Sequence, residues 1–396
     1  MSQRARLAPA SPIRKLVPLA DDARSRGTHV YHLNIGQPDI VTPEPMLAAL
    51  HDYEGPVLAY APSGGLPEFV EVLADYYRRC GIDVARRDIM VTTAASEALV
   101  FALAATLDPG DEVLIPEPLY ANYLGFSALL GLQVRPVTCA PENGYMIPPP
   151  EELDRMCGPR TKAVILCNPG NPTGRVTGKD ELERLGEWIC ERGLYLIGDE
   201  VYREFCYTGQ APPSILNLKG CEERTIMVDS LSKRFSACGA RIGCVVTRNA
   251  EVAAGMLKFA QARLSPPTLG QLMGIRAYRD LPAAYYHEVV ETYRERRDLL
   301  CTKLEAIPGV FCRKPEGAFY LMARLPVDDS EAFTRWMLTD FQMDGETIMM
   351  APGAGFYATP GLGQKEVRIA YVLETGRLER AMGILAAGLA QYPGRD

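Results

Sequence analysis

Short apolar runs alternate with longer amphipathic segments through the middle of the chain. Most of these runs are compact and rich in β-branched residues. Such runs are typical of strands that helices cover on both faces. Strands are expected at residues 89–92, 112–115, 133–137, 163–166, 194–198, 225–228 and 244–247.

The segments between these runs carry recognisable helix ends. Thr177 and Asp180 form a capping-box pattern, apolar residues follow at helical spacing, and Gly193 ends the segment. Residues 96–107 predict a second helix, which the turn at residues 108–111 ends. Strands that alternate with helices over about 160 residues predict an α/β sheet that is largely parallel.

The pattern changes after residue 285. A long charged helix is expected at residues 286–304, and it leads into a region of mixed strands and helices. This region should hold strands at 317–323 and 366–372 and helices at 330–341 and 375–390. We therefore predict an α/β fold in which a large domain at 46–284 has a mostly parallel seven-stranded sheet between helices. Residues 1–45 and 285–396 are expected to form a smaller α+β domain with an N-terminal arm.

Composition and charge narrow the function classes. The net charge of −7 over 396 residues argues against nucleic acid or an anionic membrane as the main partner. No apolar run reaches the roughly 18 to 20 residues that span a bilayer, so no membrane partner is expected. The basic N-terminus lacks the apolar core of a secretory signal. We expect a cytoplasmic protein, with a transit peptide as the alternative.

The sequence has few residues that could form a metal site or a histidine-based catalytic site. The chain has 4 His and 11 Cys, without a C-x-x-C pair or a pair of His four residues apart. We expect reduced thiols that pack as small hydrophobes, with no disulfide framework and no metal site. The chemistry should therefore rest on another residue type or on a cofactor.

One nucleophile motif offers a remote alternative. Ser230 and Lys233 match the S-x-x-K pattern of penicillin-binding acylases, in which the serine forms an acyl-enzyme. The S-D-N and K-T-G elements that accompany this pattern do not occur in the sequence. A serine acylase that uses Ser230 and Lys233 is therefore kept only as an alternative.

Polar side chains gather where predicted strands end. Three successive strands are each followed by such residues: Asn171 after the first, Asp199 and Tyr202 after the second, and Lys233 after the third. In a parallel sheet such strand ends meet at one crevice, where ligands bind. A set of Asn, Asp, Tyr, Lys, Ser and Arg without His suits pyridoxal phosphate (PLP). This cofactor needs a lysine for its Schiff base, an acid for its ring nitrogen, and cationic and hydroxyl donors for its phosphate.

The motifs in this region resemble those of one enzyme family. NPGNPTG, DEVY, SLSKRFSACGARIG and VRIAY are similar to the motifs of class I PLP-dependent aminotransferases, the aspartate-aminotransferase fold type. The resemblance extends from residues 34–39 to 366–372, in the family's order and with compatible spacing. The resemblance implies PLP-dependent transferase fold type I. The sequence motifs are most similar to those of bacterial aspartate-aminotransferase-like enzymes.

The resemblance implies a role for each residue at the cofactor. Lys233 resembles the Schiff-base lysine, which also moves the proton at the substrate Cα. Asp199 would pair with the pyridinium nitrogen, and Tyr202 and Asn171 would bind the cofactor's O3′. Tyr120 resembles the aromatic residue stacked on the ring, with a core tyrosine as the alternative.

The same resemblance places the phosphate at one helix start. Ser230, Ser232 and Arg241 would contact it, together with the turn Ala94-Ala95-Ser96 at a helix N-terminus. Because the family often has glycine in this turn, Ser96 supplies its only hydroxyl, and we expect backbone N–H groups to dominate there.

Substrate contacts come from separate parts of the chain. Arg368 resembles the arginine that clamps the substrate α-carboxylate, and Gly36 resembles the glycine that lets the N-terminal segment close. Tyr60 resembles the tyrosine that reaches the neighbouring subunit's cofactor phosphate, which implies a homodimer with shared active sites. Arg263 lies near the region where aspartate aminotransferases supply a cation for the distal substrate group across the dimer, with a structural interface salt bridge as the alternative.

Three functions are therefore considered. The resemblance favours transamination between an L-amino acid and a 2-oxo acid, with 2-oxoglutarate and glutamate as one pair and an aspartate-like donor. The second is a PLP-dependent lyase or cyclase, which the core motifs do not distinguish from a transaminase. The third is a regulatory cofactor binder, which would usually carry an added DNA-binding domain before residue 34.

Overall fold

A seven-stranded sheet forms the centre of the fold in the computed structural model, which describes residues 1–395. Its strands are β2 (Ile89–Thr92), β3 (Glu112–Glu117), β4 (Gln133–Thr138), β5 (Thr161–Cys167), β6 (Tyr195–Asp199), β7 (Thr225–Ser230) and β8 (Gly243–Thr247). The order across the sheet is β2-β8-β7-β6-β5-β3-β4, and β8 alone runs against the other strands. The seven predicted strands and the mostly parallel sheet are confirmed.

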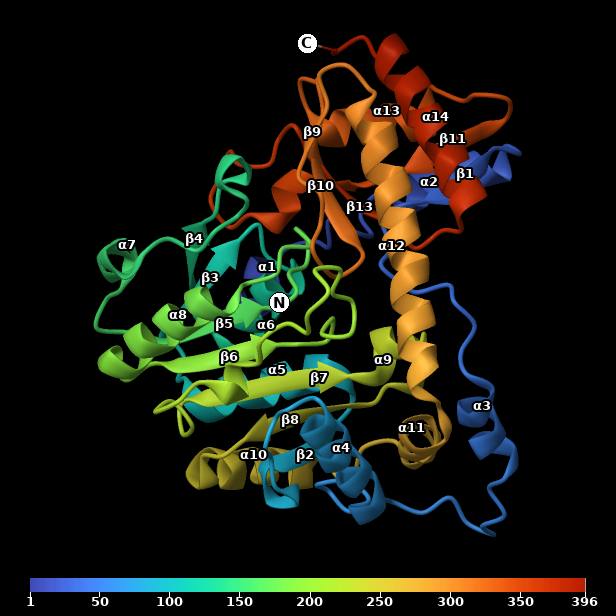
Figure 1. The fold of residues 1–396 in the computed structure, drawn as a ribbon. Helices are drawn as coiled ribbons and strands as arrows, with labels where there is room; N and C mark the ends of the chain where they lie inside the picture. The colour runs from blue at the N-terminus through green and yellow to red at the C-terminus, as the bar shows by residue number, and fades with distance from the viewer. Residues whose placement is uncertain (396) are drawn as a thin grey trace.

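Helices cover both faces of this sheet (Figure 1). They are α4 (Pro67–Arg79), α5 (Ala94–Thr106), α6 (Asn122–Leu130), α7 (Pro150–Met156), α8 (Lys179–Arg192), α10 (Ala250–Arg263) and α11 (Thr268–Asp280). The helix α3 (Glu44–His51) packs against α11, and α9 (Leu231–Arg234) is a single turn after β7. Leu114 of β3 joins the apolar cluster under α4, α8 and α11, whereas Val113 and Ile115 join the cluster under α5 and α10. Alternate residues of one strand thus fill both cores, which explains why the strands are apolar throughout.

A second sheet lies above the first in Figure 1, and α12 (Ala283–Glu305) runs between the two parts. This second sheet contains β9 (Phe311–Cys312), β10 (Tyr320–Arg324), β12 (Ala351–Pro352) and β13 (Glu366–Ala370). The helices α13 (Ser330–Thr339) and α14 (Thr375–Gln391) lie in the same part of the molecule. From the N-terminal region come α1 (Gln3–Leu7), α2 (Val17–Ser25) and β1 (His29–His32), which pairs with β11 (Glu346–Met349). That pairing favours one unit for both chain ends, although the boundaries at 46–284 stay a prediction.

Two local expectations differ from the structure. The helix expected after Thr177 begins at Lys179 with Gly178 as its cap, because the Thr177 N–H donates to Asn168 Oδ1 at 2.9 Å. Cys190 and Cys221 form a disulfide across Cα atoms 5.9 Å apart, a separation that such a bond spans. The prediction that all cysteines are reduced thiols is therefore wrong for this pair.

In the part of the chain that the structure describes, no helix combines the length and apolar character needed to cross a membrane.

Candidate active site

A cavity of about 360 Å³ lies at the carboxyl ends of β5, β6 and β7, where the predicted site residues meet. Its lining includes every predicted site residue except Tyr60 and Arg263, namely Gly36, Ala94, Ala95, Ser96, Tyr120, Asn171, Asp199, Tyr202, Ser230, Ser232, Lys233, Arg241 and Arg368. Among the described residues that line it, Asp199 is the single carboxylate, against four cations. The cavity is therefore locally cationic in a protein with a net charge of −7.

Asp199 is the last residue of β6, and its side chain lies buried in the cavity wall. The hydroxyl of Tyr123 in α6 donates to Asp199 Oδ2 at 2.8 Å, and the Val201 N–H donates to Oδ1 at 3.4 Å. Loss of hydration raises the pKa of Asp199 to about 6, although both hydrogen bonds oppose the rise. A buried acid of this kind favours a cationic partner, such as the protonated ring nitrogen of a cofactor.

Phenol and amide groups converge in the same cavity. The Tyr202 hydroxyl lies 3.0 Å from that of Tyr320 and accepts a hydrogen bond from Asn171 Nδ2 at 3.4 Å. Burial raises the pKa of Tyr202 well above its ordinary value, so this phenol keeps its proton. Sequence reasoning missed Tyr123 and Tyr320, because both lie within apolar segments that predict only buried elements.

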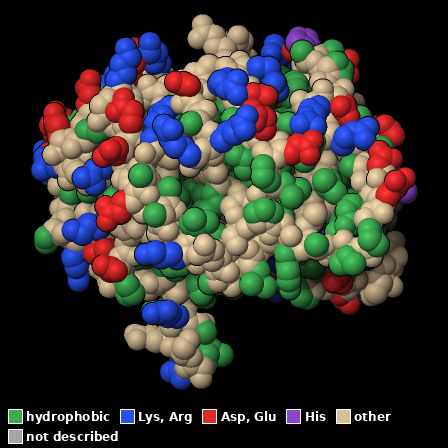
Figure 2. Space-filling view, turned by 90° about the horizontal axis from the view of Figure 1, so that it is seen from below, with side chains coloured by type: hydrophobic (Ala, Val, Ile, Leu, Met, Phe, Trp, Pro, Cys, Tyr) green, Lys and Arg blue, Asp and Glu red, His purple; other side chains and the backbone are tan. Residues whose placement is uncertain are grey.

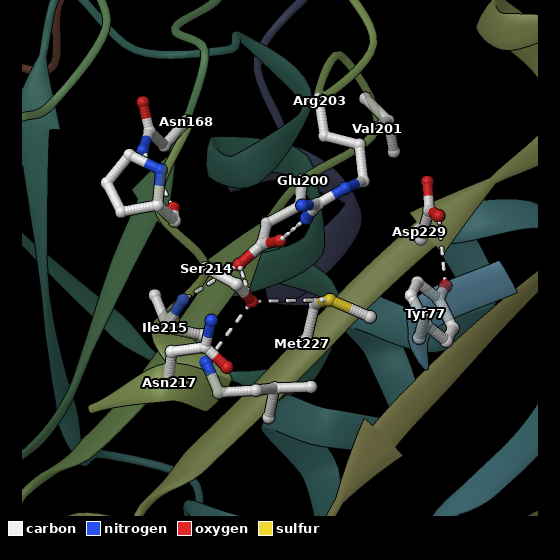
Figure 3. Close-up of polar contacts among 12 residues, drawn as sticks. Tyr77, Asn168, Glu200, Val201, Arg203, Ser214, Ile215, Asn217, Met227 and Asp229 are labelled. Carbon is white, nitrogen blue, oxygen red and sulfur yellow. Dashed lines mark hydrogen bonds and ion pairs between the residues drawn. The ribbon is translucent and has the colours of Figure 1, made fainter. Parts of the chain in front are cut away.

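The turn that follows β6 is held from behind by a buried ion pair, which Figure 3 shows. Arg203 Nη1 donates to Glu200 Oε2 at 2.6 Å. Glu200 Oε1 accepts hydrogen bonds from the Ser214 hydroxyl at 2.8 Å and from the Ile215 N–H at 2.9 Å. Both carboxylate oxygens are satisfied, so the turn that carries Tyr202 directly after Asp199 is well supported.

Lys233 comes from α9, a single helical turn that begins at the end of β7. Its Nζ lines the cavity and donates to the Gly36 carbonyl oxygen at 2.9 Å. The neighbouring Arg234 is buried and pairs with Asp229 at 2.9 Å, and the Tyr77 hydroxyl donates to the same carboxylate oxygen (Figure 3). This cluster fixes the junction of β7 and α9, from which Lys233 reaches the cavity.

Hydroxyl and N–H groups form the predicted phosphate site. Ser230 Oγ lies 2.8 Å from Ser232 Oγ and accepts a hydrogen bond from the Ser232 N–H at 3.2 Å. The cavity wall also includes the first residues of α5, where N–H groups without helical partners favour an anion. Ala94 has a φ of 60°, in the left-handed region that glycine adopts most easily. Arg241 is exposed, with Nη1 donating to the Cys238 carbonyl at 2.9 Å.

Arg368 in β13 is the buried cation of the site, with 1% of its surface exposed. Its Nη1 donates to Asn171 Oδ1 at 3.0 Å and its Nη2 to the Asn34 carbonyl at 2.6 Å. Its Nε is buried without a hydrogen-bond partner among the described residues, and loss of hydration lowers the pKa of the guanidinium. A buried guanidinium with an unused donor is suited to a carboxylate ligand.

The cavity wall includes the smallest residue, Gly36, and a large aromatic residue, Tyr120. A Cβ on Gly36 would lie 1.8 Å from the Tyr320 hydroxyl, so only glycine fits there. Tyr120 accepts a hydrogen bond from Asn122 Nδ2 at 2.7 Å, and burial raises the pKa of its phenol to about 12. Its aromatic ring is thus available in the cavity wall as a neutral stacking surface.

Tyr60 and Arg263 lie outside the cavity in the single chain. Tyr60 is 80% exposed. Arg263 ends α10 and donates from Nη2 to the Ser63 carbonyl at 3.0 Å, while its Nη1 lies 3.4 Å from Glu97. The role predicted for Tyr60 requires a second subunit, and the contacts of Arg263 fit a structural role in its own chain.

The cavity fits PLP on these grounds. It joins a buried acid, a lysine amine, three phenols, and the serine hydroxyls of Ser230 and Ser232 beside the start of α5. These are the groups that the ring nitrogen, the aldehyde, the ring oxygen and the phosphate require. In the described residues, no group of three or more His, Cys, Asp or Glu could hold a metal ion.

The sequence and the fold match known aminotransferases. Residues 28–385 match the family described as aminotransferase class I and II. The chain is 33% identical over 368 residues to the aspartate/prephenate aminotransferase of Thermus thermophilus, with 91% of both chains covered. It is 32% identical to the aspartate aminotransferase of Bacillus subtilis, with 92% of both covered, and 31% identical to aromatic-amino-acid aminotransferase 2 of Thermococcus litoralis, with 96% of both covered.

The solved structures agree. The structure of Thermus thermophilus aspartate aminotransferase with maleate superposes with a TM-score of 0.89 at 31% identity, over 98% of this chain and 99% of the other. That of aspartate aminotransferase from Thermotoga maritima gives 0.90 at 28% identity, over 99% and 100%. Both the resemblance and the fold type are confirmed: this chain belongs to the class I and II aminotransferases and is a PLP-dependent transaminase.

Proposed function

We propose that the enzyme transfers an amino group between an aspartate-like L-amino acid and a 2-oxo acid, with 2-oxoglutarate and glutamate as one pair. The observation that carries this proposal is Arg368, buried with an unused Nε donor in the cavity that also holds Lys233 and Asp199. A carboxylate bound there would bring an amino acid's Cα close to the lysine. Relatives named for aspartate support the acidic donor, and one named for aromatic amino acids marks the competing class.

The residues divide the chemistry among themselves. PLP, when bound, supplies an electron sink for the pair of electrons left at the substrate Cα. Asp199 stabilises a proton on the cofactor's ring nitrogen, because a buried carboxylate favours an adjacent positive charge. Lys233 removes the Cα proton and returns it at the cofactor's C4′. Tyr202 and Asn171, which line the cavity, would bind the ring oxygen, and Tyr120 would cover the ring.

The same cavity provides donors for the cofactor phosphate and bears on the alternative reactions. Ser230, Ser232, Arg241 and the segment Ala94–Ser96 bind the phosphate as hydroxyl, guanidinium and N–H donors. A serine acylase would need Lys233 to take the Ser230 proton, but the Ser230 hydroxyl lies 2.8 Å from both Ser232 Oγ and the Ile242 carbonyl, whereas Lys233 Nζ donates to the Gly36 carbonyl. A lyase or cyclase is distinguished from a transaminase by its products.

We propose a homodimer in which Tyr60 reaches the partner's phosphate site. Exposed apolar side chains support this: Val57, Leu58, Tyr60, Leu257, Phe259 and Leu264. Figure 2 shows hydrophobic side chains across the middle of the face seen from below. Apolar patches of this kind mark interaction surfaces. Sedimentation should give twice the 43.5 kDa chain mass, and Leu58→Glu should yield monomers, unlike Leu129→Glu. A wild-type monomer would contradict the proposal.

We also propose a cytoplasmic location. Its support is that nine of the described cysteines are free and one pair, Cys190 and Cys221, is bonded, since thiols persist in reducing compartments. Cell fractionation tests this, and recovery in a secreted fraction would contradict it.

A donor screen tests the proposed reaction. The cofactor-loaded enzyme is incubated with 2-oxoglutarate and each of a panel of L-amino acids, and both products are quantified. We expect one 2-oxo acid formed per glutamate, with the highest kcat/KM for acidic donors. Release of ammonia or of a cyclised product, without glutamate, would show lyase or cyclase chemistry instead.

A further inference from the structure

Four cations line the cavity, and the proposed function uses three of them. Lys233 holds the cofactor, Arg241 contacts the phosphate and Arg368 clamps the α-carboxylate. Arg14 is the fourth. Its side chain is exposed to solvent, and among the described residues its guanidinium has no hydrogen bond or ion pair. A cation without a protein partner in the wall of a substrate cavity is available to a ligand.

Arg14 follows a segment that is tied directly to the α-carboxylate clamp. Asn34 is fully buried, and its Nδ2 donates to the Ile13 carbonyl at 2.7 Å. The carbonyl of the same Asn34 accepts from Arg368 Nη2 at 2.6 Å. The segment is also packed from outside, since a Cβ on Gly355 would lie 2.2 Å from Pro12 Cβ. The backbone that presents Arg14 is therefore well supported.

Both guanidinium groups act on the same phenol. Burial raises the pKa of Tyr120, and the positive charges of Arg368 and of Arg14 both oppose the rise. Tyr120 is the ring proposed to cover the cofactor, so Arg14 lies within electrostatic reach of the place where substrate reacts.

We propose that Arg14 binds the distal carboxylate of an acidic substrate and so sets the enzyme's preference for dicarboxylates. The inference rests on the proposed function, in which Arg368 holds the α-carboxylate. A planar guanidinium matches a carboxylate with two parallel hydrogen bonds. Arg263, the other candidate for this task, lies outside the cavity of its own chain, where it donates to the Ser63 carbonyl, and would reach only a partner's site across the proposed dimer.

Ligand binding tests the proposal without turnover. Succinate and butyrate have the same chain length, but only succinate has a second carboxylate. We expect Arg14→Gln to weaken calorimetric binding of succinate to the cofactor-loaded protein by about 10- to 100-fold and to leave butyrate within about twofold. Arg14→Lys should lose less, because it keeps the charge without the planar fork. Arg6→Gln is the control, since Arg6 is an exposed cation of the same region outside the cavity.

Steady-state kinetics separate this inference from the proposed function. Arg14→Gln should lower kcat/KM for L-glutamate and L-aspartate about 10- to 100-fold and leave that for L-alanine nearly unchanged. Equal losses for succinate and butyrate, or for acidic and neutral donors, would overturn the role of Arg14. A wild type that transaminates no donor would overturn the proposed function, while the comparison of succinate with butyrate would still decide the role of Arg14.

Discussion

At the scale of single residues, the site is built from groups that are costly to bury alone. Asp199 loses its hydration, and Arg368 has an Nε without a partner. In the proposed function each is compensated by a ligand of opposite charge, namely a protonated ring nitrogen for the acid and a carboxylate for the guanidinium. Binding strength and folding stability are therefore opposed at these two positions.

Asp199→Asn should expose this opposition in the cofactor-free protein. A folded-state pKa of about 6, above the ordinary 3.8, means that the folded protein binds more protons between these values. Its stability therefore falls as pH rises through this window. Asn removes the effect, so the free energy of unfolding in urea should rise by about 2–3 kcal/mol near pH 8 and change little near pH 4.

The same substitution should weaken the cofactor. A titration by fluorescence should give a dissociation constant for PLP that is about 10- to 100-fold higher, because the ring nitrogen loses its charged partner. Asp108→Asn, at an exposed turn, serves as the control. An Asp199→Asn protein with unchanged stability near pH 8, or with tighter cofactor binding, would contradict this account of Asp199.

At the scale of elements, the sequence predicted what depends on local pattern. Strands apolar on both faces were recognisable because alternate residues enter two cores, as in β3. The reversed direction of β8 could not be recognised from the sequence, because the direction of a strand depends on the chain's path between strands. The cap at Thr177 failed for a related reason: its N–H serves Asn168, a contact outside the helix that a local pattern does not encode.

The site shows the same division. Residues at strand ends, such as Asp199 and Lys233, were predictable because parallel strands bring their ends together. Tyr123 and Tyr320 come from a helix and from the second sheet, and only the folded chain places their hydroxyls beside the site. The buried pair of Glu200 and Arg203 likewise became visible only with its partners Ser214 and Ile215 (Figure 3).

At the scale of the whole molecule, the cavity is assembled from distant parts of the chain. Arg14 belongs to the N-terminal region, Lys233 to the large sheet and Arg368 to the second sheet. The link from Arg368 through Asn34 to Ile13 joins the two ends of the chain at the substrate site. Arg14 was not predictable from the sequence, because no motif near it in the chain marks a site. Tyr60 is exposed in the single chain, and its predicted role depends on the proposed dimer.

The central claim is that Lys233 holds PLP in this cavity. Borohydride reduces the C=N bond of a Schiff base between a lysine and the cofactor to a stable C–N bond, which mass spectrometry of peptides can locate. Lys179→Ala removes an exposed lysine and serves as a control beside Lys233→Ala. We predict one pyridoxyl phosphate per chain, on Lys233, retained in Lys179→Ala and absent from Lys233→Ala. A reduced adduct on another lysine of the wild type, or no adduct, would contradict the account.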